Sequence, residues 1–553
     1  MASYFTRSIG AEPGVQLNPL VDSSALPSAS DSDQRFGIVM RATRGRIDRP
    51  FLVTASDVYD KLGAGEQIRV NALNTAWVHV VEALNNGAQA AVVQRITTDS
   101  AKVKYLVITK QTASEEGETA TGFDFAVAEE LPSDYFVAIK HLECFNDGII
   151  VSIHADELTE GGVNVANSAL QIRLADPDGN VLYSYEGSLV AGTVDDYGNS
   201  YYLPDVVAKN TDALEVYVGA TGDDAQIETT SDAYGYSGSG TAQWVDSGVQ
   251  VCFEEGGTDY TAAQYQAAAK SLVSSESAFT YVSSGGSESV ALLSALMDVC
   301  EEENLILKFD IPGSLTPDEA ITFLNSTGLT SRGEYAHLAQ AFWSPIKSDD
   351  PTGKNGYGIY GVATLNIAMS CARNASKDAN GFAQKRQPIA GKNYPIARTN
   401  MRPAYTTKKP EPSRLAKACI NPCGYEVYSS GGQFVFIDSL TCAATTNSLR
   451  KLAAVADMSV AVDEAVCRYG HDVLQTPMVD AIDAMEKYLE KYFENATTAK
   501  WLVTSEDDQM NGEAWRFTVS KSAEKPYDKL IVKYWLHYDG TARQIEVTQT
   551  ITK

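Results

Sequence analysis

The sequence predicts a multidomain α/β (α+β) fold, with a mixed sheet as its core and a mainly β domain inserted into that core. The chain has 553 residues, more than one hydrophobic core usually holds. Helical and strand patterns alternate near both ends, whereas the stretch between them shows strands and turns. We therefore expect the two α/β stretches to build one core together, with the β domain as an outgrowth.

The first α/β stretch shows strand, helix and strand signals in order. Apolar runs at 36–40 and 50–54 predict strands, and Ser56-Asp57 begins a short helix that ends at Gly63. Helical spacing of Leu73, Trp77, Val80, Val81 and Leu84 predicts a longer helix, which Gly87 stops before a strand that begins at Ala91.

The middle stretch predicts a succession of strands. These are expected at 106–109, 135–139, 148–153, 170–174, 214–218 and 249–253. Asp147-Gly148 and Asp178-Gly179 are typical tight-turn pairs.

Helices return after the β stretch. An apolar stripe from Val290 to Cys300 precedes a buried strand at 305–309, and Thr316-Pro317-Asp318-Glu319 predicts a capped helix start. A helix through Met485, Leu489 and Phe493 follows near the end, and 530–537 with 542–551 should form a closing hairpin. The expected parts are an N-terminal arm (1–35), a first core part (36–103), an inserted β domain (104–274), a second core part (275–530) and a C-terminal hairpin or arm (531–553).

Composition and charge restrict the partners. A formal net charge of -27 opposes the phosphate backbone, so we expect no nucleic acid as partner. No run of about 18 apolar residues occurs, so we expect no membrane insertion and an aqueous compartment. Eight scattered cysteines favour synthesis in a reducing cytoplasm. Thiols that lie close together across two copies of the chain could pair later, if the protein meets oxidising conditions outside the cell.

Catalytic and metal-binding patterns are incomplete. Cys419 and Cys423 are one residue too far apart for a CxxC motif, so small buried thiols are favoured over zinc. His79 lies in an apolar helix, where packing is favoured over catalysis. The glycine-rich 235–240 lacks the Lys of a P-loop, and 176–180 lacks the closing Glu of an EF-hand. We expect no catalytic residue, no metal and no cofactor.

A basic segment stands out in the acidic chain. Residues 384–417 carry nine Lys or Arg side chains and one acid, together with five prolines that favour an extended path. It is either a solvated loop or a docking surface for an acidic protein. Lys385, Arg386, Lys408 and Lys409 are the candidate docking residues.

Several short motifs, in this order along the chain, resemble the contractile tail sheath proteins of bacteriophages. They are Pro13-Gly14-Val15, Arg44-Gly45 with Arg49-Pro50, Asn85-Asn86-Gly87 before Ala91 to Arg95, Trp343-Ser344-Pro345, Gly358 to Ala363, Ile420-Asn421-Pro422, and Glu524-Lys525-Pro526. Gln94 departs from the family pattern, which has Arg there, and the arginine-threonine pair that usually follows the Ile420-Asn421-Pro422 strand is not obvious. The resemblance covers the core stretches and omits the β insertion.

The resemblance implies a structural subunit of a virion tail, assembled in the host cytoplasm, that polymerises around an inner tube and contracts for genome delivery. Implied partners are further copies, the tail tube protein, and baseplate and tail terminator proteins. Pro13, Gly14, Val15, Gln544, Ile545 and Val547 would lie in arms that join neighbouring subunits, and the basic segment would face the tube. An alternative from another class is an acidic, β-rich surface or adhesin protein, and a carboxylate hydrolase using Glu254 and Glu255 has no motif behind it.

Overall fold

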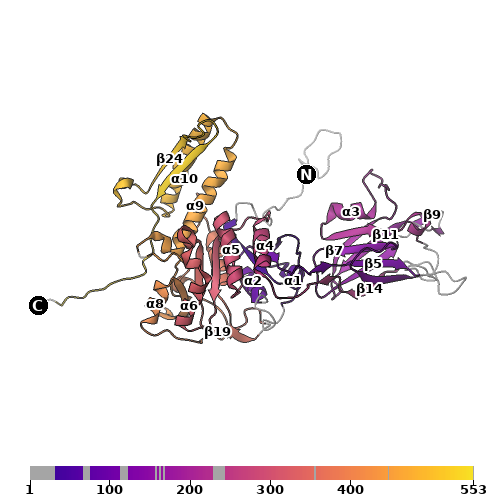
Figure 1. Ribbon diagram of the computed structural model, residues 1–553, viewed down its shortest axis with the longest axis horizontal. Coiled ribbons are helices and arrows are strands. Elements are labelled where there is room, and N and C mark those ends of the chain that lie inside the picture. Colours follow the sequence, from indigo (N-terminus) through magenta and orange to yellow (C-terminus); the bar gives the residue numbers. More distant parts are fainter. Residues whose placement is uncertain are drawn as a thin grey trace, which may run out of the picture.

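The computed structural model describes residues 32–65, 75–111, 122–155, 158–160, 163–165, 168–227, 243–353, 356–445 and 447–551. The described chain is elongated. An α/β body lies in the middle, a β body extends to one end, and a helical projection rises from the α/β body (Figure 1).

An eight-stranded mixed sheet forms the centre of the α/β body. Its strands run in the order β2-β3-β1-β16-β17-β18-β22-β23. The six from β3 to β22 are parallel, and the two edge strands are antiparallel. Their bounds are β1 Arg35–Met40, β2 Phe51–Val53, β3 Ala90–Arg95, β16 Tyr281–Ser283, β17 Ile306–Ile311, β18 Ala339–Trp343, β22 Ile420–Tyr428 and β23 Gly431–Phe436. Because β1 pairs with β16, both parts of the chain build one sheet, as predicted.

Helices cover both faces of this sheet. A side chain at Gly37 of β1 would meet Leu272 of α4. The next residue, Ile38, points to the other face, where Ile38 and Ala76 of α2 both lie beside Gly285. Helices α2 and α4 therefore lie on opposite faces of the sheet. The helices of this body are α1 Val58–Leu62, α2 Thr75–Asn85, α4 Ala262–Val273, α5 Val290–Glu303, α6 Pro317–Thr327, α7 Ala363–Ala375 and α8 Glu411–Lys417. The predicted starts and stops are confirmed: Pro317 begins α6, and Gly63 and Gly87 adopt φ of 72° and 115°.

The β body is built from the middle of the chain. One sheet has the order β12-β11-β8-β14 and the other β13-β7-β5-β6, and an apolar core lies between them. Its elements are β5 Tyr105–Lys110, β6 Phe123–Ala128, β7 Val137–His141, β8 Ile149–Ala155, β9 Leu158–Glu160, β10 Val163–Val165, β11 Ala169–Ala175, β12 Val181–Ser188, α3 Leu203–Asn210, β13 Leu214–Val218 and β14 Val245–Gln250. The predicted Asp178-Gly179 turn connects β11 to β12.

A short antiparallel pair connects the two bodies. Strand β4 (Lys102–Val103) leaves the α/β body and β15 (Phe253–Glu254) returns to it. Helix α4 comes after β15 and packs on β1 and β3, with Ala269 and Leu272 fully buried. We therefore place the end of the β insertion near residue 254, ahead of the expected boundary at 274.

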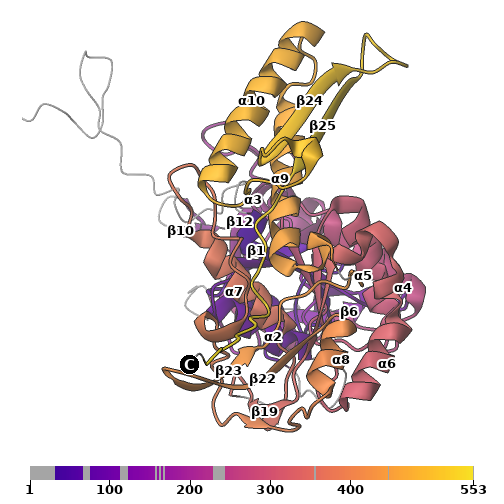
Figure 2. The same ribbon diagram turned by 90° about the vertical axis from the view of Figure 1, so that its left-hand side faces the viewer.

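The projection contains two long helices and one two-stranded sheet. Helices α9 (Ala453–Asp472) and α10 (Met478–Thr498) carry β24 (Trp515–Lys521) and β25 (Leu530–Leu536), as Figure 2 shows. Strand β25 pairs with β24 and not with 542–551, so the expected closing hairpin is wrong. Trp515 and Phe517 of β24 pack on Phe493 of α10. This packing places β24 beside β25, whereas the alternating pattern of β25 does not by itself indicate which strand it pairs with.

A three-stranded sheet lies beyond the carboxyl end of β18. Its order is β20-β19-β21, with β19 Ile346–Asp349, β20 Tyr357–Ile359 and β21 Arg402–Pro403. Across the described ranges, no helix is long and apolar enough to cross a membrane.

Candidate interaction surfaces

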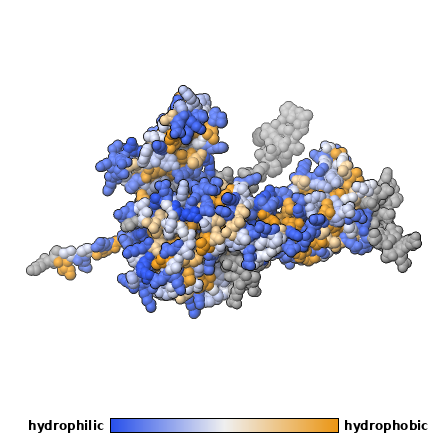
Figure 3. Space-filling view, viewed as in Figure 1, coloured by the Kyte–Doolittle hydropathy of each residue, from blue (hydrophilic) through white to orange (hydrophobic). Residues whose placement is uncertain are grey.

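The C-terminal tail is extended and exposed. Residues 540–551 have no regular structure, and the ion pair of Arg543 with Asp438 holds the root of the tail on the body. Beyond it, Ile545, Val547 and Ile551 expose 84%, 85% and 90% of their surface. Figure 3 shows the C-terminal tail extending away from the body, with hydrophobic colour along it. A strand-like chain end with unburied apolar side chains is suited to adding to the edge of a sheet in another chain.

The N-terminal arm can be placed only at its root. Pro13, Gly14 and Val15 lie outside the described residues, which begin at Ser32. There the Ser32 hydroxyl donates to Glu464 of α9 at 2.8 Å, and Asp33 pairs with Lys385 at 3.0 Å. The arm therefore enters the body beside α9.

One of the four candidate basic residues, Lys385, lies elsewhere than expected. Lys385 is only 2% exposed and pairs with Asp33, so its expected surface position is wrong. Arg386 is half-buried, with Asp539 at 3.8 Å. The proximity of Asp33, which is far away in sequence, explains the error, because a local charge count cannot show a distant partner. Lys408 and Lys409 are exposed, as expected.

The same segment contributes a second buried cation. Arg398 donates two hydrogen bonds to Glu82 of α2, at 2.6 and 2.7 Å, and both side chains are almost fully buried. Burial acts to lower the pKa of Arg398, but the charge of Glu82 and its hydrogen bonds act in the opposite direction and help to raise the pKa above its ordinary value. Much of the predicted docking charge therefore fixes this segment to its own chain.

A buried polar cluster connects α7, α9 and β17. Arg373 donates to Asp457 at 2.7 Å, and both are fully enclosed. Lys308 donates to Asn366 and Ser370, each at 2.8 Å, and burial lowers its pKa to about 8. This arrangement contains a charge pair and satisfied hydrogen bonds, which suit a structural joint between segments distant in sequence.

Asp310 lies at the carboxyl end of β17 and caps α7. Its Oδ1 atom accepts hydrogen bonds from the backbone N–H groups of Val362 and Ala363, at 2.7 and 2.9 Å. Burial raises its pKa to about 6. His79 lines the same cavity of about 150 Å³, and burial lowers its pKa to about 3, so the expected packing role of His79 is confirmed.

The cysteines show no reactive arrangement. Cys419 and Cys423 are buried, and burial raises the pKa of both thiols, which disfavours the nucleophilic thiolate. Within the part of the chain that the structure describes, no group of three or more His, Cys, Asp or Glu side chains could hold a metal ion.

Arginines gather where the two bodies meet. Arg41 forms two hydrogen bonds of 2.7 Å with Glu255, and Arg44 reaches Asp147 at 2.6 Å. Arg95 donates to the carbonyl oxygens of Gly45 and Cys144, at 2.9 and 2.6 Å. We call Arg41, Arg44 and Arg95 with these partners the neck. Its ion pairs fix the β body on the α/β body.

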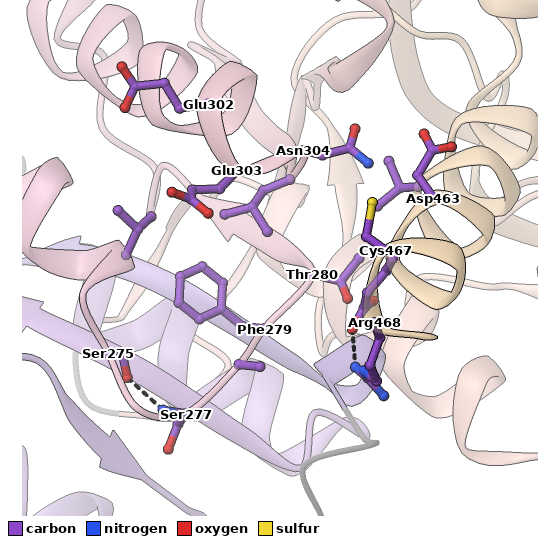
Figure 4. Close-up of a pocket in the computed structure, with 15 residues that line it drawn as sticks. Ser275, Ser277, Phe279, Thr280, Glu302, Glu303, Asn304, Asp463, Cys467 and Arg468 are labelled. Atoms are coloured by element: carbon purple, nitrogen blue, oxygen red, sulfur yellow. Dashed lines mark hydrogen bonds and ion pairs between the residues drawn. The ribbon is translucent and has the colours of Figure 1, made fainter. Parts of the chain in front are cut away.

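A large groove lies between the end of α5 and α9. Its volume is about 550 Å³, and Figure 4 shows Glu302, Glu303 and Asp463 around it. Its floor is apolar, with Val273, Phe279, Leu305 and Val460. The position of the groove at the amino ends of β16 and β17 could not be read from the sequence, because it depends on strand order.

No protein-family model and no curated protein matches the sequence. Among solved structures, the chain is similar to the sheath tail protein Lin1278 from Listeria innocua, with 10% identity and a TM-score of 0.51 over 90% of this chain and 94% of that one. It also matches part of the PVC sheath complex of an extracellular contractile injection system in the contracted state (13% identity, TM-score 0.40, 52% and 74% covered). A third match is the baseplate of the anti-feeding prophage (12% identity, TM-score 0.38, 55% and 78% covered).

The comparison with Lin1278 covers nearly the whole of both chains, and the fold therefore rests on that match. The match covers 90% of this chain, at a TM-score of 0.51. This chain has the fold of a tail sheath protein.

Proposed function

We propose that the protein is the structural subunit of a contractile phage tail sheath. It polymerises around an inner tail tube in an extended state and contracts to drive the tube through the host envelope for genome delivery. Its partners are further copies of itself, the tail tube protein, and baseplate and tail terminator proteins. The fold of a sheath tail protein supports this proposal.

The exposed C-terminal tail carries the proposal. Burying one side chain of the size of Ile or Val stabilises by about 1.5–3 kcal/mol, and three such side chains stand in water on this tail. Their alternation fits a strand added to a sheet edge. Within the described residues, β24 and β25 pair only with each other, so each keeps one edge that could accept such a strand from a neighbour.

Links of this kind suit a contracting polymer. Backbone hydrogen bonds would hold neighbours together, while the extended residues between body and arm allow the bodies to slide. Because the same interface repeats in every subunit, a small free-energy gain per subunit on contraction sums over the whole polymer.

The test removes the apolar pattern and keeps the length of the tail. Ile545→Ser, Val547→Ser and Ile551→Ser together should leave a folded, soluble monomer that forms no tubes in electron micrographs. Ile545→Val, Val547→Ile and Ile551→Val together keep the pattern and should assemble as the wild type does. Normal tubes from the serine variant, or from a chain that lacks 544–553, would contradict the role of the tail.

A further inference from the structure

The groove at the amino ends of β16 and β17 is lined by more acidic than basic described side chains. Glu302 and Glu303 are exposed and form no ion pair with a described residue. Asp463 and Glu464 lie on the opposite wall, where Glu464 pairs with Arg468, the single cation among the described lining residues, and Asp463 accepts a hydrogen bond from Tyr534. The wall also holds Thr280, whose buried hydroxyl has no hydrogen-bond partner in the described chain. An apolar floor under an acidic rim fits a basic segment that carries apolar residues.

A segment of that chemistry lies on the same molecule. Residues 402–409, which we call the basic strap, expose Arg402, Lys408 and Lys409, and none of these forms an ion pair with a described residue. Pro403 and Ala404 between them are also exposed. Among the described strands, β21 in the strap pairs only with β19, which leaves its other edge without a described partner.

The two surfaces lie at opposite ends of the same parallel strands. Thr280 directly precedes β16, and Leu305 directly precedes β17, so the groove lies at their amino ends. The strap pairs with β19, which begins three residues after β18 ends, and Tyr405 packs on Trp343 at the carboxyl end of β18. Figure 2 shows β19 and α8 at the lower end of the body and α9 above them. The strap of one chain therefore lies away from its own groove.

We propose that the basic strap of one copy docks in the acidic groove of a second copy. Two different patches that fit each other make a head-to-tail contact, which continues as a ring or as an open helical polymer. The contact also places unpaired cations against unpaired carboxylates in subunits that otherwise repel one another, with a net charge of -27 each. This inference rests on the proposed polymer and names one of its interfaces.

Charge reversal tests the contact. Lys408→Glu with Lys409→Glu reverses the strap, and Glu302→Lys with Glu303→Lys reverses the groove. Each double variant should raise the protein concentration needed for assembly, measured by light scattering and sedimentation, by about tenfold. The quadruple variant, and an equimolar mixture of the two double variants, should both restore assembly. Circular dichroism should show the same fold throughout.

The matched control places the same charge change on the β body. Lys102→Glu in β4, which also loses a surface ion pair with Glu129, together with Lys209→Glu in α3, alters two exposed lysines and should assemble as the wild type does. Unchanged assembly of the strap variant, or a quadruple variant that stays monomeric, would overturn the inference. A strap variant that assembles normally but no longer holds purified tube protein would overturn it as well and assign the strap to the tube. If the wild type forms only short oligomers that the strap variant loses, the proposed sheath fails and this interface stands.

Discussion

The α/β body and the β body are stabilised in different ways. The α/β body combines segments from both parts of the chain, and it buries the ion pair of Arg398 with Glu82 where the two parts meet. Within the second part, it buries Arg373, Asp457 and Lys308 where α7, α9 and β17 meet. The β body comes from one continuous stretch, and of its described acidic and basic side chains only His141 and Asp176 are buried. Its charged contacts with the rest of the chain include Arg44–Asp147 at the neck and the pairs of Asp212 with Arg46 and Arg49. Buried charge here marks the joints between distant segments, whereas a locally built core is stabilised by apolar packing.

Of the changes considered, excising the β body should alter the folded protein most. The structure favours cutting inside the β4–β15 pair, by replacing 105–251 with a short linker, because α4 after it belongs to the sheet packing. This excision removes Asp147, the partner of Arg44. We expect soluble, folded protein from the excision both with Arg44 and with Arg44→Gln, because Phe145 and Asp176 beside Arg44 are removed as well and its guanidinium becomes solvated. Thermal melts of both deletions check this, and insoluble protein from both would contradict an independent β body.

Asp457→Asn should have the next largest effect. It leaves the fully buried Arg373 without its charge partner, and the free energy of unfolding should fall by about 3–5 kcal/mol in urea titrations. Asp457→Leu with Arg373→Met should recover much of this loss, because it removes both charges. A double variant no more stable than Asp457→Asn would show that the pair itself stabilises the joint.

Glu255→Gln should weaken the neck by about 2 kcal/mol, since Arg41 loses a charged, largely buried partner. The neighbouring residue supplies the control: Glu254 pairs with Lys104 at an exposed position, and Glu254→Gln should cost at most about 0.5 kcal/mol. We expect calorimetry of Glu255→Gln to separate the melting of the β body from that of the α/β body. Equal effects of the two substitutions would contradict the neck.

His79 should make the α/β body sensitive to acid. Its pKa is about 3 in the folded chain and about 6.5 unfolded, so the unfolded chain takes up a proton first and stability falls as pH drops below 6.5. The loss is up to about 1.4 kcal/mol per pH unit. Asp310, with a pKa raised to about 6, has the opposite sign and gains stability as pH falls from 6 to 4.

Urea titrations at pH 6.5 and 4.5 of the wild type, His79→Gln and Asp310→Asn separate the two contributions. His79→Gln should lose less stability than the wild type on acidification, and Asp310→Asn should lose more. The same pH dependence in all three proteins would contradict these assignments.

Local sequence signals predicted many of the helices, strands and turns, but they could not predict contacts between segments that are distant in sequence. The helix with Trp77 and its stop at Gly87, the cap before Pro317 and the turn at Gly179 all depend on neighbours within a few residues. The partner of β25, the burial of Lys385 and the groove beside α5 depend on strand order and on residues far along the chain. The alternation of 542–551 predicted a strand, but the structure shows no regular element there, so a strand at this position stays a proposal for the assembled protein.

Electron microscopy of the purified, concentrated protein tests the central claim most directly. A subunit of a tail sheath should assemble into long hollow cylinders, and a helical reconstruction should show the tail at 544–551 as a strand on a neighbouring subunit. Isolated particles or short trimeric fibres, under conditions where the protein is folded, would contradict a sheath and favour a surface or adhesin protein.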